Sequence, residues 1–162
     1  MQRRYIRKFS AVPLTAALVV LLASCASQQS TAPLADEAPL AILAEDTSLT
    51  WGGCPPIFPA GCQISVLHGD PSQPNADIFL RVPAGLGLPP HTHTSAERMV
   101  LVSGTLRVKY LGSPASTLTP GQYAYGPAAL PHQATCISDE ACTLFIAFEG
   151  PVAALEYASS VD

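Results

Sequence analysis

The sequence predicts an all-β protein with a single domain. Short runs rich in Val, Ile, Leu, Phe and Tyr recur along the chain with Gly and Pro between them, a pattern typical of strands joined by turns. No stretch between Trp51 and Gly150 shows the periodicity of an amphipathic helix. Sixteen prolines and eleven glycines in 162 residues supply many turns. About a hundred residues suffice for one β-barrel core and leave no room for a second domain.

The N-terminus predicts export. Four basic residues within the first eight positions precede an apolar stretch over residues 11–23, which is the form of a secretory signal and is too short to span a bilayer. The sequence Leu22-Ala-Ser-Cys25 resembles the bacterial lipobox. The resemblance implies cleavage of a signal peptide over residues 1–24 and attachment of lipid to Cys25. Ala26 after the cysteine implies an outer membrane lipoprotein that faces the periplasm; the alternative is export with complete release.

Residues 25–49 predict a flexible tether, since Ser, Gln, Thr, Ala and Pro dominate their first half. Residues 40–44 fit either a short helix or an edge strand, and the sequence does not decide between them. After cleavage the chain keeps four basic residues against twelve acidic ones, a formal charge of −8. This charge and compartment exclude nucleic acid as an expected partner and argue against a cytosolic regulator.

The barrel is expected over residues 50–151, with 152–162 as a strand end or tail. Residues 105–111 alternate most clearly, with Leu106, Val108 and Tyr110 on one face. Gly104 separates this run from the preceding apolar run and predicts a hairpin. Strands are predicted at 63–68, 77–82, 97–103, 105–111, 122–125, 133–136 and 143–148.

Three histidines and one glutamate have spacings that let them meet at one metal ion. In extended chain, His91 and His93 point the same way with Cβ atoms roughly 6.6 Å apart, so both rings can reach one ion through bonds of about 2.0–2.1 Å. Pro89 and Pro90 argue against a helix here. Glu97 follows after a short polar stretch, and His132 must come from a different strand.

These positions resemble the two sequence motifs of the cupin superfamily. The first motif is matched at every position, by Gly85, His91, His93, Glu97 and Gly104. The second is matched by Gly121, Pro127 and His132, while Ala129 and Cys136 replace a Gly and an Asn that are not metal ligands in the family. The resemblance implies a jelly-roll barrel, or double-stranded β-helix. It also implies one divalent ion, Mn, Zn, Fe or Ni, held by His91, His93, Glu97 and His132.

The four cysteines beyond Cys25 allow three pairings, and the predicted compartment permits disulfides. The two local pairs, Cys54–Cys62 and Cys136–Cys142, are predicted because each closes a short loop. The rival hypothesis makes the Cys136 thiol a metal ligand or redox centre.

Other residues have two interpretations each. Arg81 could grip a substrate carboxylate in the pocket or point outward from its strand. Tyr123 and Tyr125 could line the pocket or pack in the core. His68 could add a fifth ligand or lie at the surface. Phe58 could be a platform for substrate or could pack in the core or at the mouth of the barrel, and packing is expected.

The resemblance implies a metal-dependent oxidoreductase, isomerase or lyase acting on a small molecule, because relatives with this ligand set include dioxygenases, oxalate-degrading enzymes and sugar isomerases. No catalytic base is evident once Glu97 binds metal, so catalytic residues stay unassigned. The alternatives are a non-catalytic envelope module that binds a metal or small ligand, and a purely structural role. Expected partners are a small molecule, the membrane through the lipid anchor, and a second copy in a homodimer.

Overall fold

The computed structural model describes residues 38–161, and this part of the chain is all-β. The predicted signal peptide, Cys25 and most of the predicted tether lie outside the described residues. Within the described range, no helix is long and apolar enough to cross a membrane. The strands are β1 Gly52–Gly53, β2 Gln63–His68, β3 Asp77–Val82, β4 Gly87–Thr92, β5 Glu97–Ser103, β6 Leu106–Tyr110, β7 Ser116–Leu118, β8 Tyr123–Gly126, β9 His132–Cys136, β10 Cys142–Phe148 and β11 Leu155–Glu156.

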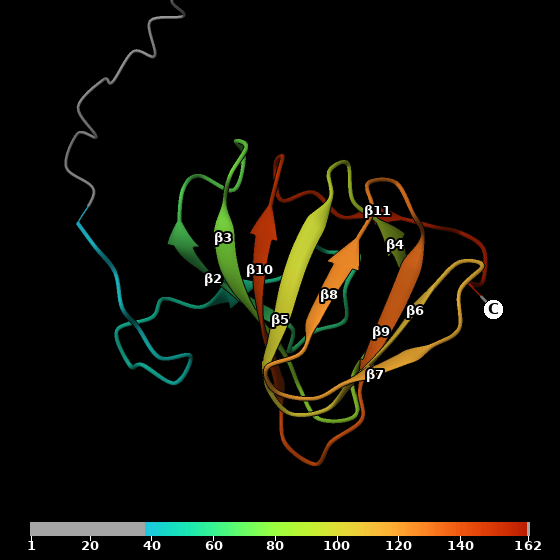
Figure 1. The fold of residues 1–162 in the computed structure, drawn as a ribbon, viewed down its shortest axis with the longest axis horizontal. Coiled ribbons are helices and arrows are strands. Elements are labelled where there is room, and N and C mark those ends of the chain that lie inside the picture. Colours follow the sequence, from blue (N-terminus) through green and yellow to red (C-terminus); the bar gives the residue numbers. More distant parts are fainter. Residues whose placement is uncertain (1–37, 162) are drawn as a thin grey trace, which may run out of the picture. The chain divides into compact units, whose positions relative to one another are not determined.

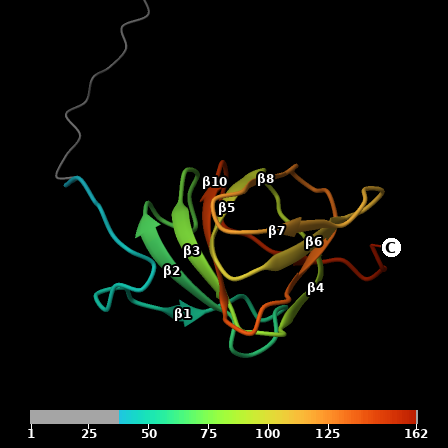
Figure 2. The same cartoon turned by 60° about the horizontal axis from the view of Figure 1, so that its bottom comes forward.

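The strands form two antiparallel sheets. The six-stranded sheet has the order β1-β2-β3-β10-β5-β8, and the five-stranded sheet has the order β11-β4-β9-β6-β7. Figure 1 shows β2, β3, β10, β5 and β8 side by side in one layer, and Figure 2 shows β6, β7 and β4 in the other. This arrangement confirms the predicted jelly-roll barrel.

The core lies between the sheets, where inward side chains of neighbouring strands stand opposite one another. Leu144 of β10 pairs with Leu80 of β3 on one side and with Leu101 of β5 on the other. Ile78, Leu101 and Leu144 are at most 2% exposed. Because the side chains of a strand alternate faces, this register puts every second residue of these strands into one continuous core.

Three strands, over residues 63–68, 77–82 and 97–103, have the bounds that the sequence predicted, and the other predicted strands differ by one residue at one or both ends. The short strands β1, β7 and β11 were not predicted, and β4 was predicted only as extended chain around His91 and His93. Residues 40–44 are neither helix nor strand. β11 pairs with β4, so the residues after 151 add a strand to the barrel.

β4 is a strand in spite of its two prolines. Its pairing with β9 shifts between Leu88 and His91, which spans Pro89 and Pro90. Proline has no N–H to donate and is tolerated where a ladder is interrupted. The irregularity therefore accommodates both prolines and returns His91 to register opposite His132.

Both predicted disulfides are confirmed. Cys54–Cys62 and Cys136–Cys142 join residues with Cα atoms 5.5 and 5.6 Å apart. Cys136 is therefore no free thiol, which excludes the rival hypothesis of a metal-binding or redox thiol there. Gly104 packs against the second disulfide: its φ is +81°, and a Cβ there would lie 2.9 Å from the Cys142 sulfur. The hairpin thus needs glycine at this position.

Candidate metal centre

The candidate ligands come from both sheets. His91 near the end of β4 stands opposite His132, the first residue of β9, and His132 stands opposite Tyr110 of β6 on its other side. Glu97 is the first residue of β5 in the facing sheet, where its register partners are Gly126 and Phe148. His93 follows β4 directly. The four predicted ligands therefore meet in the space between the sheets.

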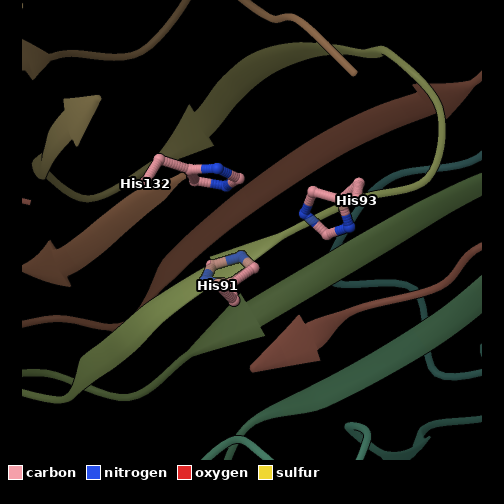
Figure 3. Close-up of side chains that lie close together, drawn as sticks. All are labelled: His91, His93 and His132. Atoms are coloured by element: carbon pink, nitrogen blue, oxygen red, sulfur yellow. The ribbon is translucent and has the colours of Figure 1, made fainter. Parts of the chain in front are cut away.

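The three histidine rings surround a common space (Figure 3). Their centroids lie 4.2 Å apart for His91 and His132, 5.0 Å for His91 and His93, and 5.2 Å for His93 and His132. One ring nitrogen from each histidine lies within 4.8 Å of the others. The side chains are 3–8% exposed. Nitrogens at these separations can share one ion with bonds of about 2.0–2.1 Å.

Each ring is oriented by a backbone carbonyl. Nδ1 of His91 lies 2.8 Å from the Pro89 oxygen, Nδ1 of His93 lies 2.7 Å from the Ala153 oxygen, and Nδ1 of His132 lies 3.2 Å from the Leu130 oxygen. A carbonyl can only accept, so Nδ1 carries the hydrogen and donates it. Nε2 of each neutral ring is then left with a lone pair, which is the arrangement found around metal-binding histidines.

The surroundings keep the rings neutral. Burial is the main cause that lowers the pKa of His91 to about 4; the hydrogen bond to Pro89 opposes this shift and the neighbouring His93 adds to it. Burial and the two other histidines lower the pKa of His132 to about 3, and burial also lowers the pKa of His93. Neutral imidazole is the form that binds metal, so the metal-free site needs no loss of histidine protons to accept an ion.

Glu97 completes the group. Its Oε2 lies 3.5 Å from Nε2 of His93, and its Oε1 lies 3.3 Å from Nε2 of His132. The side chain is 3% exposed, and burial raises its pKa to about 8, although the nearby Tyr110 hydroxyl works against this rise. Within residues 38–161, neither Glu97 Oε1 nor the Tyr110 hydroxyl has a partner at hydrogen-bonding geometry.

An unsatisfied carboxylate oxygen beside three oriented imidazoles fits a divalent cation. A buried oxygen without a partner costs about 1–3 kcal/mol, and a metal–oxygen bond would remove that cost. Three nitrogens and one carboxylate suit Mn, Fe, Ni or Zn. When bound, such an ion acts as a Lewis acid or holds a small ligand at positions the protein leaves open. The residues present therefore fit the predicted ion.

A cavity of about 60 Å³ adjoins the four side chains. Its deeper wall consists of core residues such as Val82, Leu88 and Leu106. Its mouth lies where partly exposed loop residues line it; they are Cys54, Pro55 and Phe58 from one loop, and Val152 and Ala154 from the segment after β10. Two lining residues of the sheet, Ile64 and Leu80, are also partly exposed. The candidate ligands thus lie where an apolar cavity opens towards solvent.

The predicted pocket residues Arg81, Tyr123 and Tyr125 do not line this cavity. Leu80 and Val82 face inward, so Arg81 between them faces outward, where its Nη2 donates to the Ala44 oxygen at 2.9 Å and its guanidinium lies 3.8 Å from the Trp51 ring centre. Arg81 therefore cannot grip a substrate carboxylate there.

Tyr123 and Tyr125 are 58% and 51% exposed, which excludes both the pocket and the core for them. In β8 the residues that alternate with them, Ala124 and Gly126, face inward, because the Glu97 side chain fills the space against Gly126. His68 is exposed at the end of β2 and is not part of the histidine group.

Sequence reasoning missed the role of Tyr110 and Gly126 beside Glu97. A Cβ at Gly126 would lie 2.6 Å from Glu97 Oε1 and 2.9 Å from the Tyr110 hydroxyl. The Tyr110 ring also packs against His132, with centroids 4.9 Å apart. The only signal in the sequence was that Tyr110 lies on the apolar face of an alternating strand.

Comparison with known proteins identifies the family. Residues 41–153 match the ChrR cupin-like domain. No curated protein matches the chain at a significant level.

Solved structures share the fold. DMSP lyase DddQ from Ruegeria pomeroyi DSS-3 has 24% identity and a TM-score of 0.58, covering 69% of this chain and 63% of the lyase. Oxalate oxidase has 17% identity and a TM-score of 0.52, covering 64% of this chain and 59% of the oxidase. Oxalate decarboxylase from Bacillus subtilis, a protein with Mn(II) centres, has 20% identity and a TM-score of 0.51, covering 59% and 28%. This chain thus spans less than two thirds of each, and the likeness shows the fold alone. Together with the match over residues 41–153, it establishes that this chain belongs to the ChrR cupin-like domain family of the cupin superfamily.

Proposed function

We propose that this protein binds one divalent transition-metal ion through Nε2 of His91, His93 and His132 and through the Glu97 carboxylate. The observation that carries the proposal is the orientation of the rings: each Nδ1 faces a backbone carbonyl, while ring nitrogens converge within 4.8 Å. Histidines that are placed independently on a protein surface would not be expected to share this orientation. The unsatisfied Glu97 oxygen offers a fourth ligand atom; because burial raises the pKa of Glu97 to about 8, the carboxyl would release its proton when it binds the ion and then supply one negative charge.

We infer Mn or Zn in preference to Fe or Ni. Ligand type alone does not select among these ions. The Mn(II) centres of the Bacillus subtilis oxalate decarboxylase, which has the same fold, support Mn. An exported protein also meets an oxidising compartment, which disfavours a labile Fe(II) site.

We propose further that the bound ion serves an enzymatic reaction on a small molecule, of the oxidoreductase, isomerase or lyase type. The cavity beside the ligands supports this, because a molecule inside it would lie against the ion. The similar fold of a DMSP lyase and an oxalate oxidase supports it too. In such a reaction the chain's own residues would orient the ion through four ligands and exclude water with an apolar wall.

One observation favours a second function, the non-catalytic binding of a metal or small ligand. Besides the four candidate ligands, no ionisable side chain lines the cavity. Once Glu97 binds the ion, the wall supplies no general base. Turnover would then depend on a proton acceptor on the substrate or in solvent. Detection of substrate conversion by the metal-loaded protein decides between the two functions.

We also propose that the protein is an outer membrane lipoprotein that faces the periplasm, anchored through Cys25. The two disulfides support an oxidising compartment, and the basic and apolar residues before Cys25 support export. Metabolic labelling with palmitate tests it: wild type should carry label in the membrane fraction, and Cys25→Ser should not. Label on Cys25→Ser would contradict the assignment.

Elemental analysis of protein purified without added metal tests the central proposal. We expect close to one divalent ion per chain in wild type and a large loss in His93→Ala. His68→Ala is the matched control, because it removes an exposed histidine outside the group and should keep the ion. Stoichiometric metal that persists in His93→Ala, or no metal in wild type even after loading, would overturn the assignment.

A further inference from the structure

The cavity offers a ligand almost no polar partner beyond the candidate metal ligands. Its remaining lining residues are aliphatic or aromatic side chains, Met99, Pro55 and the disulfide-bonded Cys54; no Lys, Arg, Ser, Thr, Asn or Gln is among them. A hydroxyl or amide buried against this wall would lose its hydrogen bonds to water, which weakens binding by about tenfold or more. Sugars and other polyols are therefore poor ligands for it.

Only the histidine end of the cavity can hold a negative charge. No lysine or arginine lines the wall, and Arg81, which the sequence offered as a pocket residue, faces outward towards Ala44 and Trp51. A second anionic group on the same ligand would be buried without a counter-charge, which is strongly unfavourable. The wall thus selects molecules with one anionic group.

The free volume limits the size of the molecule. A dry apolar cavity of about 150 Å³ accommodates benzene. The 60 Å³ here leaves room for about two or three carbon atoms by the same measure. The remaining wall is formed by closely packed core residues such as Val82 and Leu106, which are at most 2% exposed, so extra room is available only at the mouth.

Phe58 lies at the mouth of the cavity. Its ring stands edge-on to the His91 ring, with centroids 4.7 Å apart. The loop that carries it is closed by the Cys54–Cys62 disulfide and held by hydrogen bonds from the Cys54 amide to the Cys62 oxygen at 3.2 Å and from the Phe58 amide to the Pro55 oxygen at 2.9 Å. In Figure 2 the loop after β1 lies at the lower edge of the barrel. A stapled loop holds Phe58 in place as a fixed boundary.

We propose that the cavity binds a short aliphatic molecule with a single anionic group, such as a monocarboxylate, and that Phe58 determines the chain length it accepts. This inference rests on the proposed metal site. The anionic group lies at the histidine end, and the aliphatic chain lies against the apolar wall. Phe58 is a specificity-determining residue, since its ring bounds the partly exposed end of the cavity.

Calorimetric titration of the metal-loaded protein with acetate, propionate, butyrate and hexanoate tests the proposal. Affinity should rise about fourfold for each methylene that is buried and should fall once the chain exceeds about three carbons. Succinate, which has the carbon count of butyrate but carries a second carboxylate at the far end of its chain, should bind at least tenfold more weakly than butyrate, and glycerol at least tenfold more weakly than the best monocarboxylate. Succinate binding as tightly as butyrate, or glycerol binding as tightly as propionate, would overturn the ligand class.

Variants of Phe58 test the length limit. Phe58→Ala should move the optimum to a longer chain, and Phe58→Trp should move it to a shorter one. Ile57→Ala is the matched control, because Ile57 belongs to the same loop but does not line the cavity. An unchanged optimum in the folded Phe58 variants, or an equal shift in Ile57→Ala, would refute the role of Phe58.

Metal content, measured on the same samples, separates this inference from the proposed function. A full complement of metal with no preference among the ligands refutes the ligand class alone. Absence of metal refutes the metal site. Should Phe58→Ala fail to fold, the wild-type series and Phe58→Trp still decide the outcome.

Discussion

Substitution of Gly126 by Ala should displace Glu97 and weaken metal binding. Gly126 stands opposite Glu97 in the β5–β8 ladder. A Cβ built there would lie 2.6 Å from Glu97 Oε1, 2.7 Å from Glu97 Cγ and 2.9 Å from the Tyr110 hydroxyl, whereas real Cβ atoms essentially never come within 3.0 Å. Ordinary contact begins at 3.4 Å, so the carboxylate must move by about 0.8 Å, the difference between 3.4 and 2.6 Å.

A movement of this size is large for a metal ligand. Metal–ligand distances vary by only about 0.2 Å. Glu97 would therefore either lose its bond to the ion or move the ion away from the histidine nitrogens. Substitution of a residue that supports a metal ligand typically lowers metal affinity about 10–100-fold. We expect Gly126→Ala to lower the metal affinity by a factor in about this range. The overpacked strand should also lose about 1–3 kcal/mol of unfolding free energy. Backbone strain adds nothing, because the φ of Gly126 is not in the left-handed region.

Competition with a fluorescent chelator measures the affinity, and chemical denaturation measures the stability. Gly87→Ala is the matched control: Gly87 is also a strand glycine of the barrel, but a Cβ there would meet Thr135 at an ordinary 3.5 Å. It should leave the metal affinity unchanged. If Gly126→Ala binds metal as tightly as wild type, Glu97 is free to move and the proposed packing against Gly126 is incorrect.

Two further predictions concern Tyr110 and the Cys136–Cys142 disulfide. Tyr110→Phe removes a hydroxyl without a hydrogen-bond partner in the described part of the chain, so the unfolding free energy should change by less than about 1 kcal/mol. Chemical denaturation measures this change, and a larger loss of unfolding free energy would reveal a hydrogen bond to Glu97. Replacing Cys136 and Cys142 together by Ser should cost about 2–3 kcal/mol of stability, seen as a lower thermal midpoint, and equal stability of wild type with and without reductant would argue against this.

The metal-free protein should be most stable between about pH 6 and 7. Above this, Glu97, whose pKa rises to about 8 on folding, ionises first in the unfolded state, so stability falls by about 1 kcal/mol per pH unit up to pH 8. Below it, the histidines, whose pKa values fall on folding, take up protons first in the unfolded state, so stability falls again. Denaturation series across pH check this, and a flat profile would contradict it.

Local patterns were enough to predict most strands and the ligand set. Residues 63–68 and 77–82 became strands at the predicted bounds, because period-two alternation and flanking turn residues are local properties. The three histidines and Glu97 were identified as candidate ligands from their spacing along the chain, which can be read before the fold is known. The disulfides followed from short separations, which bring their cysteines together in almost any fold.

What the sequence did not predict depends on register and on which face of a strand is inside. Tyr123 and Tyr125 lie on one face of β8, and as aromatic residues they were expected to point inward. The smaller Ala124 and Gly126 face inward instead, because the Glu97 side chain occupies the space against Gly126. The pairing of Glu97 with Gly126 joins residues far apart in sequence. Arg81 faces outward because side chains of a strand alternate faces and its neighbours Leu80 and Val82 face inward.

The ligands add a second connection between the two sheets, which the hydrophobic core already packs together. His91 and His132 belong to one sheet and Glu97 to the other, while His93 is bonded to the segment after β10 through Ala153. A bound ion would therefore clamp both sheets at the mouth, and mass action would add its binding free energy to the stability of the fold. The deeper core, with Leu101 and Leu144 fully buried, makes no contact that depends on the ion. Removal of the metal should thus loosen the mouth and leave the barrel folded, unlike small zinc domains that unfold without their ion.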